Sequence, residues 1–348
     1  MEIGLIGLPQ SGKTTVFEAI THTLKDKSSK NTNIGISRVE DPRIDELVAL
    51  FDPKKISKAE VTFVDIPTSP ESLGKSQSIS GEYLNILQRM DALVEVIRYF
   101  DNPSVPHIFE TIDIKRDSKT LKEELIFSDL TIIDKRIERL NSELKGARND
   151  KKESIIKEIG QLTNVKENLE NNIPIKDQNL DKDTAEIVWN FQLLSAKPLL
   201  SVLNIDEDKI NHKDSRDTIS ICAQLEKELA EMPEEDQLMF RESLGIEESG
   251  KNKLIDKSYA LLNLISFFTV GPDEVKAWTI TQGMSALEAA GQIHSDIQKG
   301  FIKAEVIGYQ NMIESKKMAE AKKLGLLRLE GKEYLMNDGD IAHFMFNK

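Results

Sequence analysis

Residues 4–21 read GLIGLPQSGKTTVFEAIT, and this stretch decides the fold. Gly7, Gly12, Lys13 and Thr14 occupy the defined positions of the phosphate-loop pattern G-x-x-x-x-G-K-[S/T]. Glycines let the backbone turn several N–H groups inward around an anion, and the helix that follows adds the positive end of its dipole. In this pattern Lys13 reaches the β- and γ-phosphates and the Thr14 hydroxyl binds Mg²⁺. The stretch therefore predicts a triphosphate-binding loop.

The flanks of the loop support this interpretation. The apolar run MEIGLIGL before the loop predicts a buried strand, and the apolar residues in TTVFEAIT after it have helical spacing. Strand, glycine loop and helix in this order are the context that the motif requires. The predicted nucleotide-binding residues of this region are Gly7, Gln10, Ser11, Gly12, Lys13, Thr14 and Thr15.

Composition narrows the class of protein. The chain has 348 residues and a formal net charge of −13, which argues against nucleic-acid binding by bulk charge. It contains no apolar run of the roughly 20 residues that a membrane span needs, and its N-terminus does not follow the pattern of a signal peptide. Cys222 is the single cysteine, so an intramolecular disulfide is excluded and a reducing cytoplasm is expected. Five scattered histidines offer no metal-ligand spacing.

Four further apolar segments alternate with helical patterns along the chain. The predicted strands are residues 59–67, 92–100, 197–208 and 217–224. Helical spacing lies between them, as in DPRIDELVALF and SGEYLNILQRM. This alternation predicts βαβ units and a mostly parallel sheet of the α/β class. Ligands bind such sheets at the carboxyl ends of the strands, where the phosphate loop, Asp65 and Asn204 all fall.

Residues 118–172 have a different character, because they are rich in Lys, Glu, Leu and Ile and contain no proline. Apolar side chains recur three and four residues apart on both sides of the break GARND: Leu130, Ile133, Ile137, Leu140 and Leu144 before it, and Ile155, Ile159, Leu162, Val165 and Leu169 after it. This spacing predicts an antiparallel coiled-coil hairpin of two helices. Its outward charges indicate a solvated face or, alternatively, an arm that binds a partner.

The chain from Leu264 onward alternates strand-like and helical segments and predicts a small α+β domain. Near its end, a turn at Asp338-Gly339 is expected to separate two short strands. Four lysines form a local basic patch in this acidic protein: Lys316, Lys317, Lys322 and Lys323. They are interpreted either as a solubilising helix face or as a site for a phosphate backbone.

Taken together, these segments resemble the Obg-like ATPase family, the YchF branch of the P-loop GTPase superfamily. The resemblance spans nearly the whole chain and rests on the phosphate loop, DPRIDEL, TFVDIP, NIDED, SICAQLEKEL and the segments FFTVGPDEVKAWTI and LRLEGKEYLMNDGDIAHFMF. It implies a nucleotide domain (residues 1–105 and 185–263), an inserted helical hairpin (106–184) and a β-grasp domain of the TGS type (264–348). It also implies ATP binding and hydrolysis, Mg²⁺ as cofactor, and association with ribosomes.

The preference for adenine or guanine depends on the segment NIDED, residues 204–208. Guanine-specific relatives use N-K-x-D, whose aspartate pairs with two guanine N–H groups, whereas the matching residues here are Asn204, Ile205, Asp206 and Glu207. A glutamate places its carboxylate one methylene farther out and cannot keep that geometry. The resembled family carries Asn-x-x-Glu together with a preference for ATP. We therefore expect ATP over GTP, with Asn204, Ile205 and Glu207 near the base, unless NIDED is only a polar loop.

The residues around the γ-phosphate depart from the resembled family. Thr14 and Asp65 match its metal-binding positions, but its Asp-x-x-Gly motif continues here as Pro67 and Thr68. Proline has no N–H to donate. The first switch segment is shortened to KDKSSKN, where Ser29 is a doubtful substitute for the metal-contacting threonine. Slow or partner-dependent hydrolysis is expected, and no catalytic residue is assigned beyond Lys13, which would stabilise the phosphates.

Three classes of function remain at this stage. The first is an ATP-hydrolysing switch that acts with the ribosome through the TGS-like domain and the helical arm. The second is a nucleotide-binding scaffold, or a GTP-binding protein with degenerate switches and little hydrolysis. The third is a small-molecule kinase, which is disfavoured because no lid or acceptor site is recognisable. Neither a membrane nor DNA is expected as a partner.

Overall fold

The computed structural model describes residues 1–21, 32–66, 79 and 81–347. Contacts divide the chain into two compact units, of which the first comprises residues 1–35 and 62–253 and the second residues 36–61 and 254–348. The chain thus passes between the units three times. The division into three domains that the sequence suggested, with the hairpin as a domain of its own, stays a prediction.

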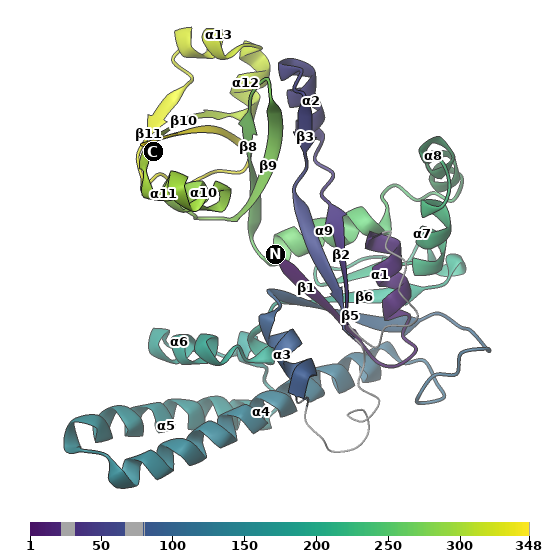
Figure 1. Ribbon diagram of the computed structural model, residues 1–348. Helices are drawn as coiled ribbons and strands as arrows, with labels where there is room; N and C mark the ends of the chain where they lie inside the picture. Colours follow the sequence, from purple (N-terminus) through teal and green to yellow (C-terminus); the bar gives the residue numbers. More distant parts are fainter. Residues whose placement is uncertain (22–31, 67–78, 80, 348) are drawn as a thin grey trace. The chain divides into compact units, whose positions relative to one another are not determined.

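A six-stranded sheet organises the first unit (Figure 1). Its order is β2 (Asn33–Arg38), β4 (Glu60–Asp65), β1 (Glu2–Gly7), β5 (Ala92–Tyr99), β6 (Leu199–Ile205) and β7 (Thr218–Ile221). The pairs β1–β4, β1–β5, β5–β6 and β6–β7 are parallel. The α/β class with a mostly parallel sheet is therefore confirmed, and all four strands predicted after the phosphate loop are present with shorter bounds. The sequence analysis missed β2.

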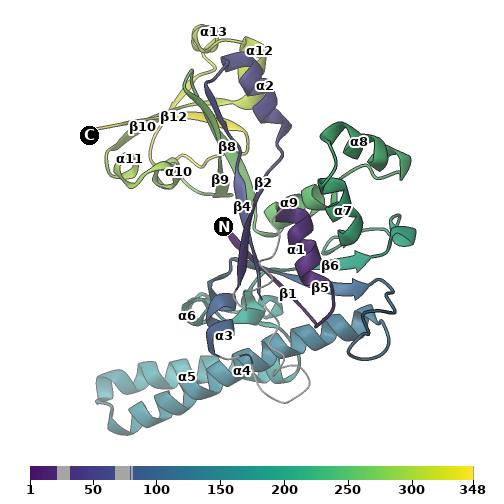
Figure 2. The ribbon, with the colours of Figure 1, turned by 45° about the vertical axis from the view of Figure 1, so that its right-hand side comes forward.

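Helices cover both faces of this sheet. α1 (Lys13–Thr21) and α7 (Ala223–Ala230) lie together on one face, and α3 (Gly81–Arg89) and α4 (Ile114–Gly146) lie on the other (Figures 1 and 2). Leu93 of β5 packs with Leu87 of α3 and Leu125 of α4 in one apolar cluster. This unit also contains α6 (Lys182–Phe191), α8 (Glu234–Ser243) and the short helices η1 (Ile175–Asp177), η2 (Leu194–Ala196) and η3 (Glu207–Lys209). α9 (Gly250–Leu261) spans the division between the units.

The predicted helical hairpin is confirmed. α4 runs antiparallel to α5 (Asn149–Glu170), and the two helices extend away from the sheet of their own unit (Figures 1 and 2). Asp113 caps α4 by accepting hydrogen bonds from the backbone N–H groups of residues 115 and 116, both at 3.0 Å. The apolar stripe of the hairpin is buried between the helices, and salt bridges such as Arg136–Glu158 (2.8 Å) flank it. In the described part of the chain, no helix has both the length and the apolar character needed to cross a bilayer.

The second unit is built on a mixed sheet. Its order is β11 (Arg328–Glu330), β10 (Phe301–Gly308), β12 (Asp340–Phe346), β8 (Leu264–Val270), β9 (Glu274–Thr281) and β3 (Lys55–Ser57). Neighbouring pairs are antiparallel except β12–β8 and β3–β9, which are parallel. The helices are α2 (Pro42–Phe51), α10 (Ala286–Ile293), α11 (Ser295–Lys299), α12 (Tyr309–Ser315) and α13 (Met318–Lys323). The small α+β unit expected from the sequence is therefore present.

Two local expectations for this unit need correction. The helix predicted at DPRIDELVALF forms as α2, but it packs against β9 and α12 of the second unit and not as a crossover helix on the parallel sheet. The turn at Asp338-Gly339 is followed by β12, but the expected short strand directly before the turn does not form. There, Leu335 makes an isolated bridge with Ser285. Asp338 instead accepts a hydrogen bond from the Ser266 N–H at 2.9 Å, so its side chain ties the turn to β8.

Candidate functional site

The phosphate loop connects β1 to α1, and its two glycines are required by contacts with its surroundings. A Cβ atom on Gly7 would lie 2.6 Å from Ser11 Oγ and 2.7 Å from the Val96 carbonyl oxygen. Gly12 has a φ of +81°, and a Cβ there would lie 2.1 Å from Asn204 Nδ2. Any larger residue at either position would displace the loop, so both predicted glycines are needed for the loop to close.

Lys13, Thr14 and Asp65 converge at the carboxyl ends of β1 and β4. Lys13 Nζ lies 3.1 Å from Asp65 Oδ1 and also donates to the backbone carbonyl of Ile66. Thr14 Oγ1 donates to Asp65 Oδ2 at 3.0 Å. The Lys13 and Asp65 side chains are only 8% and 2% exposed, so the pair is largely shielded from water. The structure brings together the three residues that the sequence assigned to phosphate and metal.

Asn204 fastens the loop from the neighbouring strand. Its Nδ2 donates to the Ser11 carbonyl oxygen at 3.1 Å, and its Oδ1 accepts from the Ala223 N–H at the start of α7 at 3.3 Å. Asn204 is 5% exposed. The predicted residue therefore lies at the site, where it links the loop, β6 and α7.

The other residues of NIDED have different surroundings. Ile205 is 4% exposed and packs with Leu225 and Leu229 of α7 in an apolar cluster. Asp206 accepts hydrogen bonds from the Asp101 N–H and from Lys209 Nζ, both at 2.9 Å, and the latter bond raises the pKa of Lys209. Glu207 begins η3 and is exposed. Of the predicted base-binding residues, Asn204 and Glu207 are thus polar groups at the strand end, whereas Ile205 faces the core.

The remaining candidates lie as follows. Gln10 is exposed in the loop with a φ of +64°, and Thr15 is half-buried in the first turn of α1. Ser11 is 2% exposed, and no described residue forms a hydrogen bond with its hydroxyl. The first switch segment with Ser29, and Pro67 and Thr68 after Asp65, lie outside the described residues.

Two residues near the site were not anticipated. Asn33 of β2 donates from Nδ2 to Asp65 Oδ2 at 3.4 Å. The Phe100 ring lies against the loop, since a Cβ on Gly12 would be 3.4 Å from its Cε1 atom, and the Arg98 guanidinium stacks 4.4 Å from the ring centroid. An aromatic residue at the end of the predicted strand 92–100 was the only signal for Phe100, and Asn33 carried none.

The described residues offer few side chains that could bind a metal ion or act as a nucleophile. In residues 1–21, 32–66, 79 and 81–347, no three His, Cys, Asp or Glu side chains are grouped to hold a metal ion by themselves. A metal at this site would thus depend on Thr14, Asp65 and a bound phosphate. Burial raises the pKa of the Cys222 thiol, which keeps it protonated and weakly nucleophilic.

The basic patch of the second unit lies on α13 and on the short segment between α12 and α13. All four lysines are exposed: Lys316, Lys317, Lys322 and Lys323. Lys323 lies 3.4 Å from Glu320, and Arg328 on β11 lies 3.6 Å from Glu330. The patch is therefore accessible and only partly neutralised by neighbouring carboxylates.

Comparison with known proteins gives one consistent result. Residues 264–347 match the family model YchF-GTPase_C, described as a protein of unknown function (DUF933). The Ribosome-binding ATPase YchF of Bacillus subtilis is 35% identical, with 99% of this chain and 98% of that protein covered. The protein of the same name from Escherichia coli O157:H7 is 31% identical over the same shares. The structure of the Schizosaccharomyces pombe YchF GTPase superposes with a TM-score of 0.86 at 28% identity and covers 99% of this chain and 97% of that one.

Proposed function

This chain belongs to the YchF family, and from that premise we propose that it is a ribosome-associated ATPase which binds Mg·ATP through its phosphate loop and hydrolyses it slowly. The observation that carries the proposal is the convergence of Lys13, Thr14 and Asp65 beside a loop whose glycines admit no side chain. Its homologues, which align over their full length, are named ribosome-binding ATPases. Association with ribosomes would place the protein in the cytoplasm.

The residues present fit a phosphate and a magnesium ion. Lys13 supplies a buried positive charge, which a nucleotide phosphate would attract away from Asp65. Thr14 and Asp65 supply a hydroxyl and a carboxylate, the oxygen ligands that Mg²⁺ takes in nucleotide sites. When bound, the ion would neutralise charge on the β- and γ-phosphates. Gly7, Gln10, Ser11, Gly12 and Thr15 would supply the loop around them.

We assign the base contacts to the carboxyl end of β6. Asn204 and the exposed Glu207 lie there, while buried Ile205 supports the strand from its other face. Glu207 is too long for the two-point contact that aspartate makes with guanine, so ATP is expected over GTP. Competition of ATP and GTP against a fluorescent ATP analogue tests this preference. Binding of GTP as tight as that of ATP would contradict it.

Slow turnover follows from the departures at Pro67, Thr68 and Ser29, because proline has no N–H for the γ-phosphate, threonine replaces the motif's glycine, and serine replaces the metal-contacting threonine. Steady-state phosphate release should be far below the roughly 1–100 s⁻¹ of ordinary ATPases and should rise with ribosomes or with potassium ions. Fast turnover by the isolated chain would refute the slow-switch proposal. Tight ATP binding with no release under any of these conditions would favour the second candidate, a nucleotide-binding scaffold.

The ribosome contact is assigned to the TGS-like second unit together with the helical arm. The lysines of the patch, with Arg328 beyond them, would meet a phosphate backbone locally, although the chain as a whole is acidic. A variant with all four lysines changed to glutamate should co-sediment less with ribosomes than the wild type does. Binding of the wild type to ribosomes should weaken as the salt concentration rises. The matched control changes the same four residues to arginine and preserves the charge. Unchanged binding of the glutamate variant would move the contact elsewhere.

A further inference from the structure

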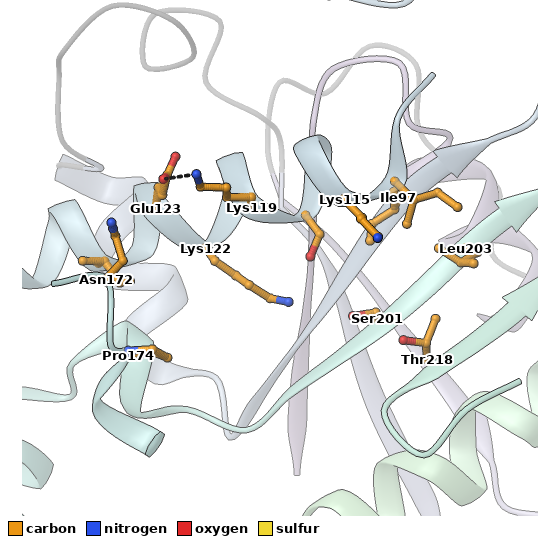
Figure 3. A pocket seen from close by; sticks show the side chains of 13 residues that line it. Ile97, Lys115, Lys119, Lys122, Glu123, Asn172, Pro174, Ser201, Leu203 and Thr218 are labelled. Carbon is orange, nitrogen blue, oxygen red and sulfur yellow. Dashed lines mark ion pairs between the residues drawn. The ribbon is translucent and has the colours of Figure 1, made fainter. Parts of the chain in front are cut away.

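A cavity of about 480 Å³ lies under the root of the helical arm, between α4 and the sheet of the first unit (Figure 3). One wall is the first three turns of α4, and the opposite wall is formed by β5, β6 and β7. The segment with Asn172 and Pro174 closes one end. The volume is in the range of about 300–1,000 Å³ that is typical of small-molecule sites. None of the residues assigned above to nucleotide or metal lines it.

The lining combines an apolar floor with a basic and hydroxylic rim. Ile97 and Leu203 form part of the floor, which is suited to a flat or aliphatic body. Lys115 and Lys122 point from α4 toward the strands, whereas Lys119 pairs with Glu123 at 3.6 Å along the helix (Figure 3). Within the described residues no carboxylate pairs with the Lys115 ammonium, so this cation is available to an anionic ligand.

Glu95 organises the polar part of the cavity wall. It is completely buried on the α4 side of β5, and its Oε1 atom contacts three groups that line the cavity: Ser118 Oγ at 2.9 Å, Ser201 Oγ at 2.5 Å and Lys122 Nζ at 3.3 Å. Its Oε2 atom is buried and accepts no hydrogen bond from any residue that the structure describes. Glu95 does not itself line the cavity, so it holds the Ser118, Ser201 and Lys122 groups in place from behind the wall.

We propose that this cavity binds a small organic acid, a carboxylate or phosphate, with an apolar body. The acid group lies near Lys115, and the body lies on Ile97 and Leu203. Such a ligand connects α4 to β5 and β6, which also carry Phe100 and Asn204 at their carboxyl ends. The site therefore joins the root of the arm to the strands that end at the phosphate loop.

The test uses the full-length protein and matched probes. Fluorescence titration with 6-hydroxy-2-naphthoate and with 6-hydroxy-2-naphthyl phosphate distinguishes carboxylate from phosphate. We expect at least one of them to bind with a Kd below about 1 mM. 2-Naphthol, which lacks the acid, should bind about tenfold more weakly, since it loses the contact to the Lys115 ammonium.

Variants test whether the probes bind in this cavity. Lys115→Glu should weaken the acid probes at least about tenfold by replacing attraction with repulsion, and Thr218→Trp should block the cavity from the edge strand. Lys135→Glu, an exposed lysine farther along α4, is the control and should leave the Kd unchanged. Circular dichroism melts check that the variants are folded. No saturable binding of either probe up to about 5 mM, or equal affinity in wild type and Thr218→Trp, would overturn the proposal.

Discussion

Changing Lys13 to methionine should destabilise the nucleotide-free protein as well as remove nucleotide binding. The lysine and Asp65 form a pair whose side chains are 8% and 2% exposed, with 3.1 Å between Nζ and Oδ1. Removing one partner of such a pair leaves a buried charge without compensation and costs about 3–5 kcal/mol. Asp65 keeps hydrogen bonds from Thr14 and Asn33, so the lower end of this range, about 3 kcal/mol, is expected.

The expected loss is measurable by calorimetry. For a folding unit of this size, about 3 kcal/mol corresponds to a drop in Tm of roughly 6–12 °C. The double variant Lys13→Met/Asp65→Asn removes both charges and should lose less stability than the sum of the two single variants, by about 0.5–3 kcal/mol, the coupling energy typical of a contacting pair. Mg·ATP should raise the Tm of the wild type and leave that of both variants unchanged.

Two results would refute this reasoning. A Tm of nucleotide-free Lys13→Met within about 2 °C of wild type would show that the pair contributes little to stability. Additive effects of the two substitutions would show that Lys13 and Asp65 do not interact in solution. In either case the two side chains would be solvated separately, and the site would be more open than the structure shows.

Three further predictions concern stability. Burial raises the pKa of Glu124 from 4.5 to about 7, so the folded chain binds an extra proton between these values and loses stability as the pH rises through them. Because Glu124 is partly exposed, Glu124→Gln should stabilise the protein by no more than about 1 kcal/mol at pH 8 and not at all at pH 4. Urea titrations at both pH values test this. Arg43→Ala removes ion pairs of 2.8 Å to Asp41 and Asp338 and should lower the free energy of unfolding by about 1–2 kcal/mol. Calorimetry with Arg43→Lys as the control measures this, and a loss below about 0.3 kcal/mol would contradict it. Ser285→Ala breaks the capping box of α10 and should cost about 1 kcal/mol, while Ser285→Thr should largely keep it; equal stability of the two variants would show that the cap is not needed.

The sequence located the phosphate loop because the motif fixes both residue type and spacing. It did not tell how NIDED is oriented. Consecutive side chains of a strand point to opposite faces, so once Asn204 is directed at the loop, Ile205 is directed into the core with α7. A match to a motif places a residue along the chain, whereas the pleat of the strand determines which side it faces.

Elements were harder to predict where their partners are distant in sequence. The spacing of Ile44 and Leu47 predicts the buried face of α2, and both residues are completely buried, but nothing in the pattern indicates that β9 and α12 cover that face. β3 has only three residues and no apolar periodicity, and it exists because it pairs with β9. Asn33 reaches Asp65 through the fold alone, without a local signal.

The insertion of residues 36–61 into the second unit has a consequence for biosynthesis. α2 and β3 leave the ribosome early, but their partners β9 and α12 are made only near the end of the chain. At about 5–20 residues per second, the apolar face of α2 waits on the order of 10–50 seconds for its cover. In the chain, α2 lies between β2 of the first sheet and β3 of the second. During this interval the nascent chain exposes a hydrophobic helix, so the second unit can reach its final packing only when synthesis is nearly finished.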